Sequence, residues 1–125
     1  MRKDIPKITD GELKVLEVLW EKAPICASEI VAALKQRASW NRNTTYTFIN
    51  RLVDKNVISR EEPGFVCTAL YTRDEIGVSE ACSFLNKMYE GSLKMLVTSF
   101  LNNEALSEKE IAEIRKLIET SLHKK

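Results

Sequence analysis

The side chains best suited to binding another molecule lie in one predicted helix, over residues 42–55. Its helical spacing turns one side toward the body of the protein, and that side carries Thr45, Phe48, Ile49 and Leu52. The opposite side presents short hydrogen-bonding groups and an arginine: Asn43, Thr44, Tyr46, Thr47, Asn50 and Arg51. Asparagine and threonine can hydrogen-bond base edges, whereas arginine and tyrosine suit phosphates. This outward face therefore predicts contact with nucleic acid.

Two residues at the start of this helix extend the predicted contact surface. Arg42 suits a phosphate, and Trp40 could lay its ring along the sugar-phosphate chain and donate its indole N–H. Asp54, near the helix end, is the only carboxylate on the outward face, so little on that face repels a phosphate. Two plainer interpretations stay open: the polar face is only a solvated surface, and Trp40 is a core residue.

Catalysis and metal binding find no support in the residue types. His123 is the only histidine, and neither a Ser/His/Asp set nor a glycine-rich phosphate loop can be assembled. The cysteines, Cys26, Cys67 and Cys82, are odd in number and widely spaced, which favours buried small side chains over a disulfide framework or a zinc site. We therefore expect no catalytic site, no cofactor and no metal.

Composition places the chain among folded globular proteins. It has 125 residues, of which 44% are hydrophobic and 30% charged. The net charge of +1 does not by itself indicate nucleic acid, although basic residues slightly outnumber acidic ones before residue 74. No apolar run approaches the roughly 18 residues of a membrane helix, and residues 1–6 lack the apolar stretch of a signal peptide. We expect a cytoplasmic protein without membrane insertion.

Two more helices are predicted before residue 40. Thr9 and Glu12 have the spacing of a capping box, which predicts a first helix of about 13 residues that ends at Ala23-Pro24. Ile25 falls in a short extended link before a second helix over residues 27–37. Asn41 is the expected N-cap of the third helix.

A hairpin follows the third helix. Residues 57–60 and 65–71 are rich in strand-forming side chains and flank residues 61–64, where Pro63-Gly64 supplies a turn. Three helices and a hairpin are the order of a winged helix-turn-helix. The predicted fold is therefore mainly α with a small β-hairpin wing, and its DNA-binding domain spans residues 1–73.

Residues 74–125 predict helices that are apolar on one side. Gly91 and Asn102-Asn103 interrupt this pattern, and Ser107 and Glu110 form a box that caps a last helix. The first domain already closes a small core, so this apolar side needs another partner, and a second copy of the chain is the natural one. We expect a helical homodimerisation domain whose interface includes Val78, Cys82, Leu85, Tyr89, Leu93, Leu96, Val97, Phe100 and Leu101.

Three segments resemble the penicillinase-repressor family, which includes repressors of beta-lactamase and methicillin-resistance genes and related copper-responsive repressors. Residues 8–20 resemble its opening, and residues 40–53 match its Trp, short polar turn, Thr-x-x-Thr and Arg-Leu. Residues 84–93 resemble its C-terminal half. The resemblance implies a homodimer on a two-fold symmetric operator in double-stranded DNA, contacted by Trp40, Asn43, Thr44, Tyr46, Thr47 and Arg51.

The resemblance also implies relief of repression by proteolysis. A membrane sensor metalloprotease system leads to cleavage before a Phe in the dimerisation helices, and the matching bond here is Ser99-Phe100. This chain departs from better-known members in having Ser99 in place of Asn. Clustered C-terminal cysteines, as in the copper-responsive relatives, are absent from the sequence.

The wing is the other departure. Glu61-Glu62 stand where family wings usually carry a basic residue, so we expect the wing to contribute little affinity for DNA. A winged-helix adaptor that binds protein without specific DNA binding is the alternative function, favoured by the acidic wing and the near-neutral charge.

Overall fold

The computed structural model describes residues 5–123, which form two compact units that divide between Ala81 and Cys82. Residues 1–4, part of the segment in which no signal peptide is expected, lie outside the described part.

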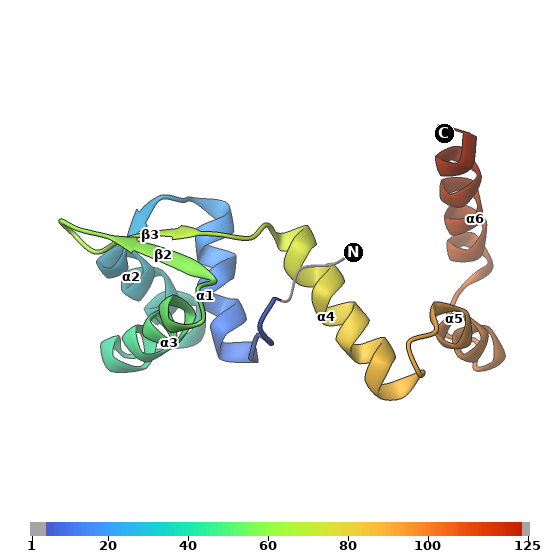
Figure 1. Ribbon diagram of the computed structural model, residues 1–125, viewed down its shortest axis with the longest axis horizontal. Helices are drawn as coiled ribbons and strands as arrows, with labels where there is room; N and C mark the ends of the chain where they lie inside the picture. The colour runs from blue at the N-terminus through green and yellow to red at the C-terminus, as the bar shows by residue number, and fades with distance from the viewer. Residues whose placement is uncertain (1–4, 124–125) are drawn as a thin grey trace. The chain divides into compact units, whose positions relative to one another are not determined.

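The first unit is a winged helix (Figure 1). Its helices are α1 (Asp10–Glu21), α2 (Ala27–Ala38) and α3 (Arg42–Asp54), followed by the wing strands β2 (Ile58–Glu61) and β3 (Val66–Ala69). The predicted fold class is confirmed. The expected link at Ile25 is a short strand, β1 (Ile25–Cys26), that pairs antiparallel with β3, so the sheet has three strands in the order β1-β3-β2.

Local hydrogen bonds explain where the helices begin. The Thr9 hydroxyl accepts the N–H of Glu12 at 3.2 Å, while the Glu12 carboxylate accepts the N–H of Thr9 at 2.9 Å. Together these two bonds satisfy backbone donors that the first turn of α1 would leave unpaired. Asn41 caps α3, because its side-chain oxygen accepts the N–H of Thr44 at 2.8 Å. Both predicted caps are confirmed.

The core of this unit lies between the three helices and the sheet. Leu16, Leu19, Ile30 and Leu34 from α1 and α2 are fully buried in it. Helix α3 adds Ile49 and Leu52, together with Thr45, whose hydroxyl donates to the Asn41 carbonyl at 3.2 Å and so remains satisfied. The inward side predicted for this helix is therefore confirmed.

The first unit extends past residue 73 into α4 (Arg73–Met88), because the first half of α4 is anchored to the segment that precedes α1. Ile76 is buried, and the Glu80 carboxylate accepts the N–H of Ile8 at 3.2 Å.

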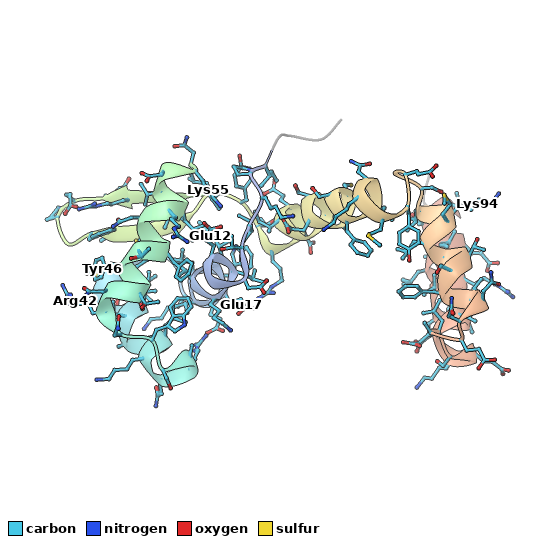
Figure 2. All side chains as sticks on the ribbon, turned by 90° about the horizontal axis from the view of Figure 1, so that it is seen from below. Glu12, Glu17, Arg42, Tyr46, Lys55 and Lys94 are labelled. Atoms are coloured by element: carbon cyan, nitrogen blue, oxygen red, sulfur yellow. The ribbon has the colours of Figure 1, made fainter. Side chains whose placement is uncertain are left out.

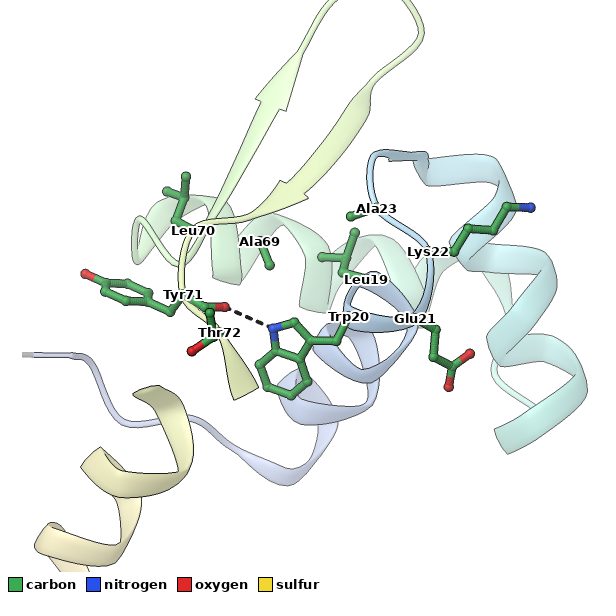
Figure 3. A pocket seen from close by; sticks show the side chains of 9 residues that line it. All are labelled: Leu19, Trp20, Glu21, Lys22, Ala23, Ala69, Leu70, Tyr71 and Thr72. Atoms are coloured by element: carbon green, nitrogen blue, oxygen red, sulfur yellow. Dashed lines mark hydrogen bonds between the residues drawn. The ribbon is translucent and has the colours of Figure 1, made fainter. Parts of the chain in front are cut away.

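The Trp20 indole N–H donates to the Tyr71 carbonyl at 2.9 Å beside an open pocket of about 370 Å³ (Figure 3).

The second unit contains the rest of α4, then α5 (Leu93–Asn102) and α6 (Glu108–His123). The predicted caps are present, since Ser107 and Glu110 exchange backbone-to-side-chain bonds at 2.9 and 3.1 Å. From residue 82 to residue 122 the structure buries no side chain. Within the described residues, no helix is long and apolar enough to cross a membrane.

Candidate nucleic-acid interface

Helix α3 is held to the body of the first unit by an aromatic contact at its middle. The Phe48 ring stacks on the Trp40 ring, with centroids 4.9 Å apart and planes 24° apart. The far edge of the Phe48 ring lies against Gly11 of α1, and a Cβ at residue 11 would overlap the ring. Trp40 is half-buried and packs against the core, and its contact with DNA stays a prediction.

An ion pair holds the C-terminal end of the same helix. The Lys55 ammonium donates to the Glu12 carboxylate at 2.7 Å and to the Lys7 carbonyl at 2.9 Å. Figure 2 shows Glu12 and Lys55 together at this end of α3, with Arg42 and Tyr46 at the opposite end. Glu12 is only 1% exposed, and its second oxygen, Oε2, has no hydrogen-bond partner among the described residues.

The ionisation of Glu12 follows from these contacts. Burial raises the pKa of its carboxyl, but hydrogen bonds from Lys55 and from the Thr9 backbone outweigh burial and hold the pKa below its ordinary value. Glu12 is therefore a charged, buried group that joins the start of α1 to the end of α3.

The predicted contact residues of α3 lie on its outward side. Arg42, Asn43, Thr47, Asn50 and Arg51 are exposed, and Thr44 and Tyr46 are half-buried. The Thr47 hydroxyl donates to the Asn43 carbonyl at 2.9 Å. This bond fixes the Thr47 side chain and leaves its methyl group and its acceptor capacity available.

The arginines of this helix are held by rings. The Arg42 guanidinium lies 4.9 Å from the centre of the Tyr46 ring, and that of Arg51 lies 5.2 Å from the centre of the Phe48 ring. Such cation–π contacts restrict the side chains while their N–H groups remain free to meet an anion.

The wing contributes two residues that were not predicted as site residues, Arg60 and Phe65. The Phe65 ring meets the Tyr46 ring edge-on at 5.5 Å, and the Arg60 guanidinium lies 3.6 Å from the centre of the Phe65 ring. Arg60 also donates to Glu62 at 2.9 Å, which neutralises one of the two wing carboxylates locally. The sequence places Arg60 at the end of the predicted strand 57–60, but its ring and ion-pair partners are set by the fold.

The side chains predicted for the dimer interface are exposed or half-buried. Val78, Leu93, Val97, Phe100 and Leu101 are exposed, whereas Cys82, Leu85, Tyr89 and Leu96 are half-buried. The structure exposes further large apolar side chains that were not among those site residues: Phe84, Met88, Met95, Ile114, Leu117, Ile118 and Leu122.

The Ser99-Phe100 bond lies inside α5. The Ser99 carbonyl accepts two bonds from Asn103, one from its backbone N–H at 3.1 Å and one from its side-chain amide at 2.8 Å. A protease that needs an extended substrate would have to unwind this turn.

The sequence and the fold match known repressors. Residues 8–120 match the family described as Penicillinase repressor. Two proteins with that name are similar to the chain: one from Bacillus licheniformis is 33% identical, with 98% of each chain covered, and one from Staphylococcus aureus is 34% identical, with 90% of each covered. The methicillin resistance regulatory protein MecI of Mammaliicoccus sciuri is 30% identical, over 90% of this chain and 93% of that protein.

Two solved structures are similar to part of this chain. They are the DNA-binding domain of the repressor BlaI, and monomeric BlaI of Bacillus licheniformis in complex with the blaP half-operator. Each has a TM-score of 0.53 and 31% identity, and each match covers 60% of this chain and 93% of the other. The description of the family as repressors agrees with the prediction that the chain is not an enzyme. The chain belongs to the penicillinase repressor family.

Proposed function

We propose that this chain is a dimeric transcriptional repressor that occupies a two-fold symmetric operator in DNA through α3. The supporting observation is the two-sided character of α3, whose apolar side is buried and whose Asn, Thr and Arg side is exposed. Predicted DNA contacts are Trp40, Arg42, Asn43, Thr44, Tyr46, Thr47, Asn50 and Arg51. The relatives named as repressors, and the BlaI structure solved with a half-operator, support the same function.

The second unit supports the dimer part of the proposal. Its exposed stripe includes Leu93, Val97 and Leu101 on α5 and Leu117 and Leu122 on α6. A helical unit with no buried side chain gains little stability alone, so a second copy would supply the missing surface. Two linked winged helices would then bind two half-sites about 34–36 Å apart per helical turn, and the second binding event would be intramolecular.

Relief of repression is proposed to follow cleavage at Ser99-Phe100, in a pathway that begins with a membrane sensor metalloprotease. Cleavage there would separate α6 from the rest of the chain and remove Phe100 and Leu101 from the α5 stripe. The dimer would weaken while every predicted contact on α3 stayed intact. The proposal places this repressor in the cytoplasm.

A gel-shift titration with the DNA upstream of the chain's own gene tests the DNA-binding function. The proposal expects a shift that weakens as salt rises, because phosphate contacts release counterions. Arg51→Ala is expected to weaken this shift. Arg37→Ala is the matched control and should not weaken it, since Arg37 lies on α2 and is paired with Glu21. If neither this DNA nor neighbouring promoters shift at low salt, the adaptor alternative replaces the proposal.

A further inference from the structure

An aromatic pair joins the wing to the outward side of α3. Tyr46 comes from the N-terminal part of α3 and Phe65 from the residue before β3, and their rings meet edge-on at 5.5 Å with planes 65° apart. This geometry is one that aromatic pairs prefer. Both residues are half-buried, so the pair forms part of the surface as well as part of the packing.

The backbone at Phe65 supports a specific role for this contact. Phe65 has a φ of 51°, in the left-handed region that a non-glycine residue rarely occupies. Two bonds hold it there: its N–H donates to the Glu62 carboxylate at 3.3 Å, and its carbonyl accepts the N–H of Ala27 at 3.0 Å. Phe65 is thus a strained residue that bonds hold on both sides, with its ring directed at α3. This arrangement indicates that Phe65 positions the side chains that contact its ring.

An arginine lies against each ring of the pair. The Arg60 guanidinium is 3.6 Å from the centre of the Phe65 ring, and the Arg42 guanidinium is 4.9 Å from the centre of the Tyr46 ring. Both arginines are exposed. Without the ring contact, Arg60 would be a flexible side chain on a hairpin. With it, Arg60 and Arg42 are joined through one chain of ring contacts.

We infer that Arg42 and Arg60, aligned by the Tyr46–Phe65 pair, form a two-arginine site for backbone phosphates of DNA, with Phe65 as its positioning residue. A planar guanidinium can bind a phosphate through two parallel N–H groups, and a ring that fixes its plane reduces the ordering that binding requires. The inference rests on the proposed function and adds the wing to it.

Glu62 has a defined role in this site. One carboxylate oxygen binds Arg60 at 2.9 Å and the other accepts the N–H of Phe65, so Glu62 shapes the turn and acts as an exposed counter-ion for Arg60. A phosphate would compete with it for the guanidinium. Glu62→Gln keeps an acceptor for the Phe65 N–H and removes the competing charge, so this variant is expected to bind DNA more tightly.

Fluorescence anisotropy of the full chain on a labelled fragment from upstream of its own gene, over a range of salt concentrations, tests the site. Arg60→Ala is expected to weaken binding roughly tenfold and to lower the slope of log affinity against log salt by about one. Phe65→Ala is expected to have a similar effect, and the double variant to be no weaker than Arg60→Ala alone, since Phe65 acts through Arg60 while Arg42 keeps its contact with the Tyr46 ring. Phe65→Tyr keeps a ring at this position and, unlike Phe65→Ala, is expected to bind DNA as the wild type does.

The possible results separate the inference from the proposed function. If the wild-type chain shows no salt-dependent binding to this fragment, the proposed function and the inference both fail. If the wild type binds but Arg60→Ala and Arg42→Ala leave the slope unchanged, only the two-arginine site is wrong. Additive losses in the Phe65→Ala and Arg60→Ala double variant would overturn the positioning role. If Phe65→Ala unfolds, Phe65→Leu replaces it, because leucine fills the site but offers no ring for Arg60.

Discussion

The ring of Phe48 in α3 lies against the backbone of Gly11 in α1, so closely that any side chain at residue 11 would overlap it. Because Phe48 also stacks on Trp40, this contact sets how far α3 stands from α1. The orientation of the predicted DNA-contacting side of α3 depends on that separation.

Gly11→Ala is therefore expected to destabilise the first unit by about 1–3 kcal/mol, because the Phe48 ring must move out of a packed site. Gly77→Ala is the matched control: residue 77 also lies in a helix, but a Cβ there meets no atom of residues 5–123 within 4 Å. That control should be neutral or stabilising by up to about 1 kcal/mol. Urea denaturation measures the free energy of unfolding of both variants. Equal values would contradict the close contact between Phe48 of α3 and Gly11 of α1.

The Glu12–Lys55 pair predicts a loss of stability in acid. Because the folded-state pKa of Glu12 lies below its ordinary value of 4.5, the unfolded chain binds the proton more readily. The contribution of Glu12 is therefore fully present above about pH 4.5 and is lost as the pH falls through the lower folded-state pKa. Thermal unfolding from pH 7 to pH 3 should show this loss in the wild type and a smaller pH dependence in Glu12→Gln.

Removing Lys55 tests the same pair at neutral pH. Lys55→Met is expected to cost roughly 2–4 kcal/mol, since the Glu12 carboxylate would stay buried without its counter-ion. Arg37→Ala breaks an exposed pair with Glu21 and should leave the free energy of unfolding nearly unchanged. Equal effects of the two substitutions in chemical denaturation would contradict the buried role of Glu12.

Two substitutions on α3 should change DNA binding in different ways. Arg51→Ala is expected to weaken binding to all sequences and to lower the salt slope by about one, because Arg51 is assigned to a phosphate. Thr47→Ala removes a methyl group and a hydroxyl from the base-contacting side, and should instead change which base pair is preferred at one position. Competition with singly substituted operator fragments separates the two effects, and a uniform loss in both variants would reject the role of Thr47.

The apolar stripe of α5 predicts a dimer that one charge can dissociate. Leu101→Glu would place an unpaired carboxylate in the proposed interface, and should weaken the dimer at least tenfold. Leu70→Glu is the control, because Leu70 is an exposed leucine of similar accessibility in the first unit. Sedimentation velocity over a range of concentrations distinguishes them. A wild-type chain that stays monomeric at high concentration would contradict the proposal.

Local features of the fold could be predicted from the sequence because they depend on neighbouring residues. The Thr9–Glu12 box, the Asn41 cap and the buried spacing of Ile49 and Leu52 all follow from interactions within about one helical turn. The strand at β1 could not be predicted from its two residues, because its hydrogen bonds come from β3, about forty positions later.

The candidate site was predicted where it lies on one helix and missed where it spans two elements. The polar side of α3 was predicted by spacing alone. The wing appeared acidic because Glu61 and Glu62 could be counted. The Arg60–Glu62 pair depends on the shape of the hairpin, and the Tyr46–Phe65 contact requires the hairpin to be placed against α3. Ring contacts between residues far apart in the chain produce no periodic pattern in the sequence, so they could not be predicted from it.

A footprint on the DNA upstream of the chain's own gene tests the central claim most directly, namely that two copies of α3 present their Asn, Thr and Arg sides to two half-sites. We predict two protected half-sites related by a two-fold axis, with centres one turn of DNA or a whole multiple apart, and loss of both in Arg51→Ala at moderate salt. Protection of a single half-site by the wild type, or unchanged protection in Arg51→Ala, would contradict the account.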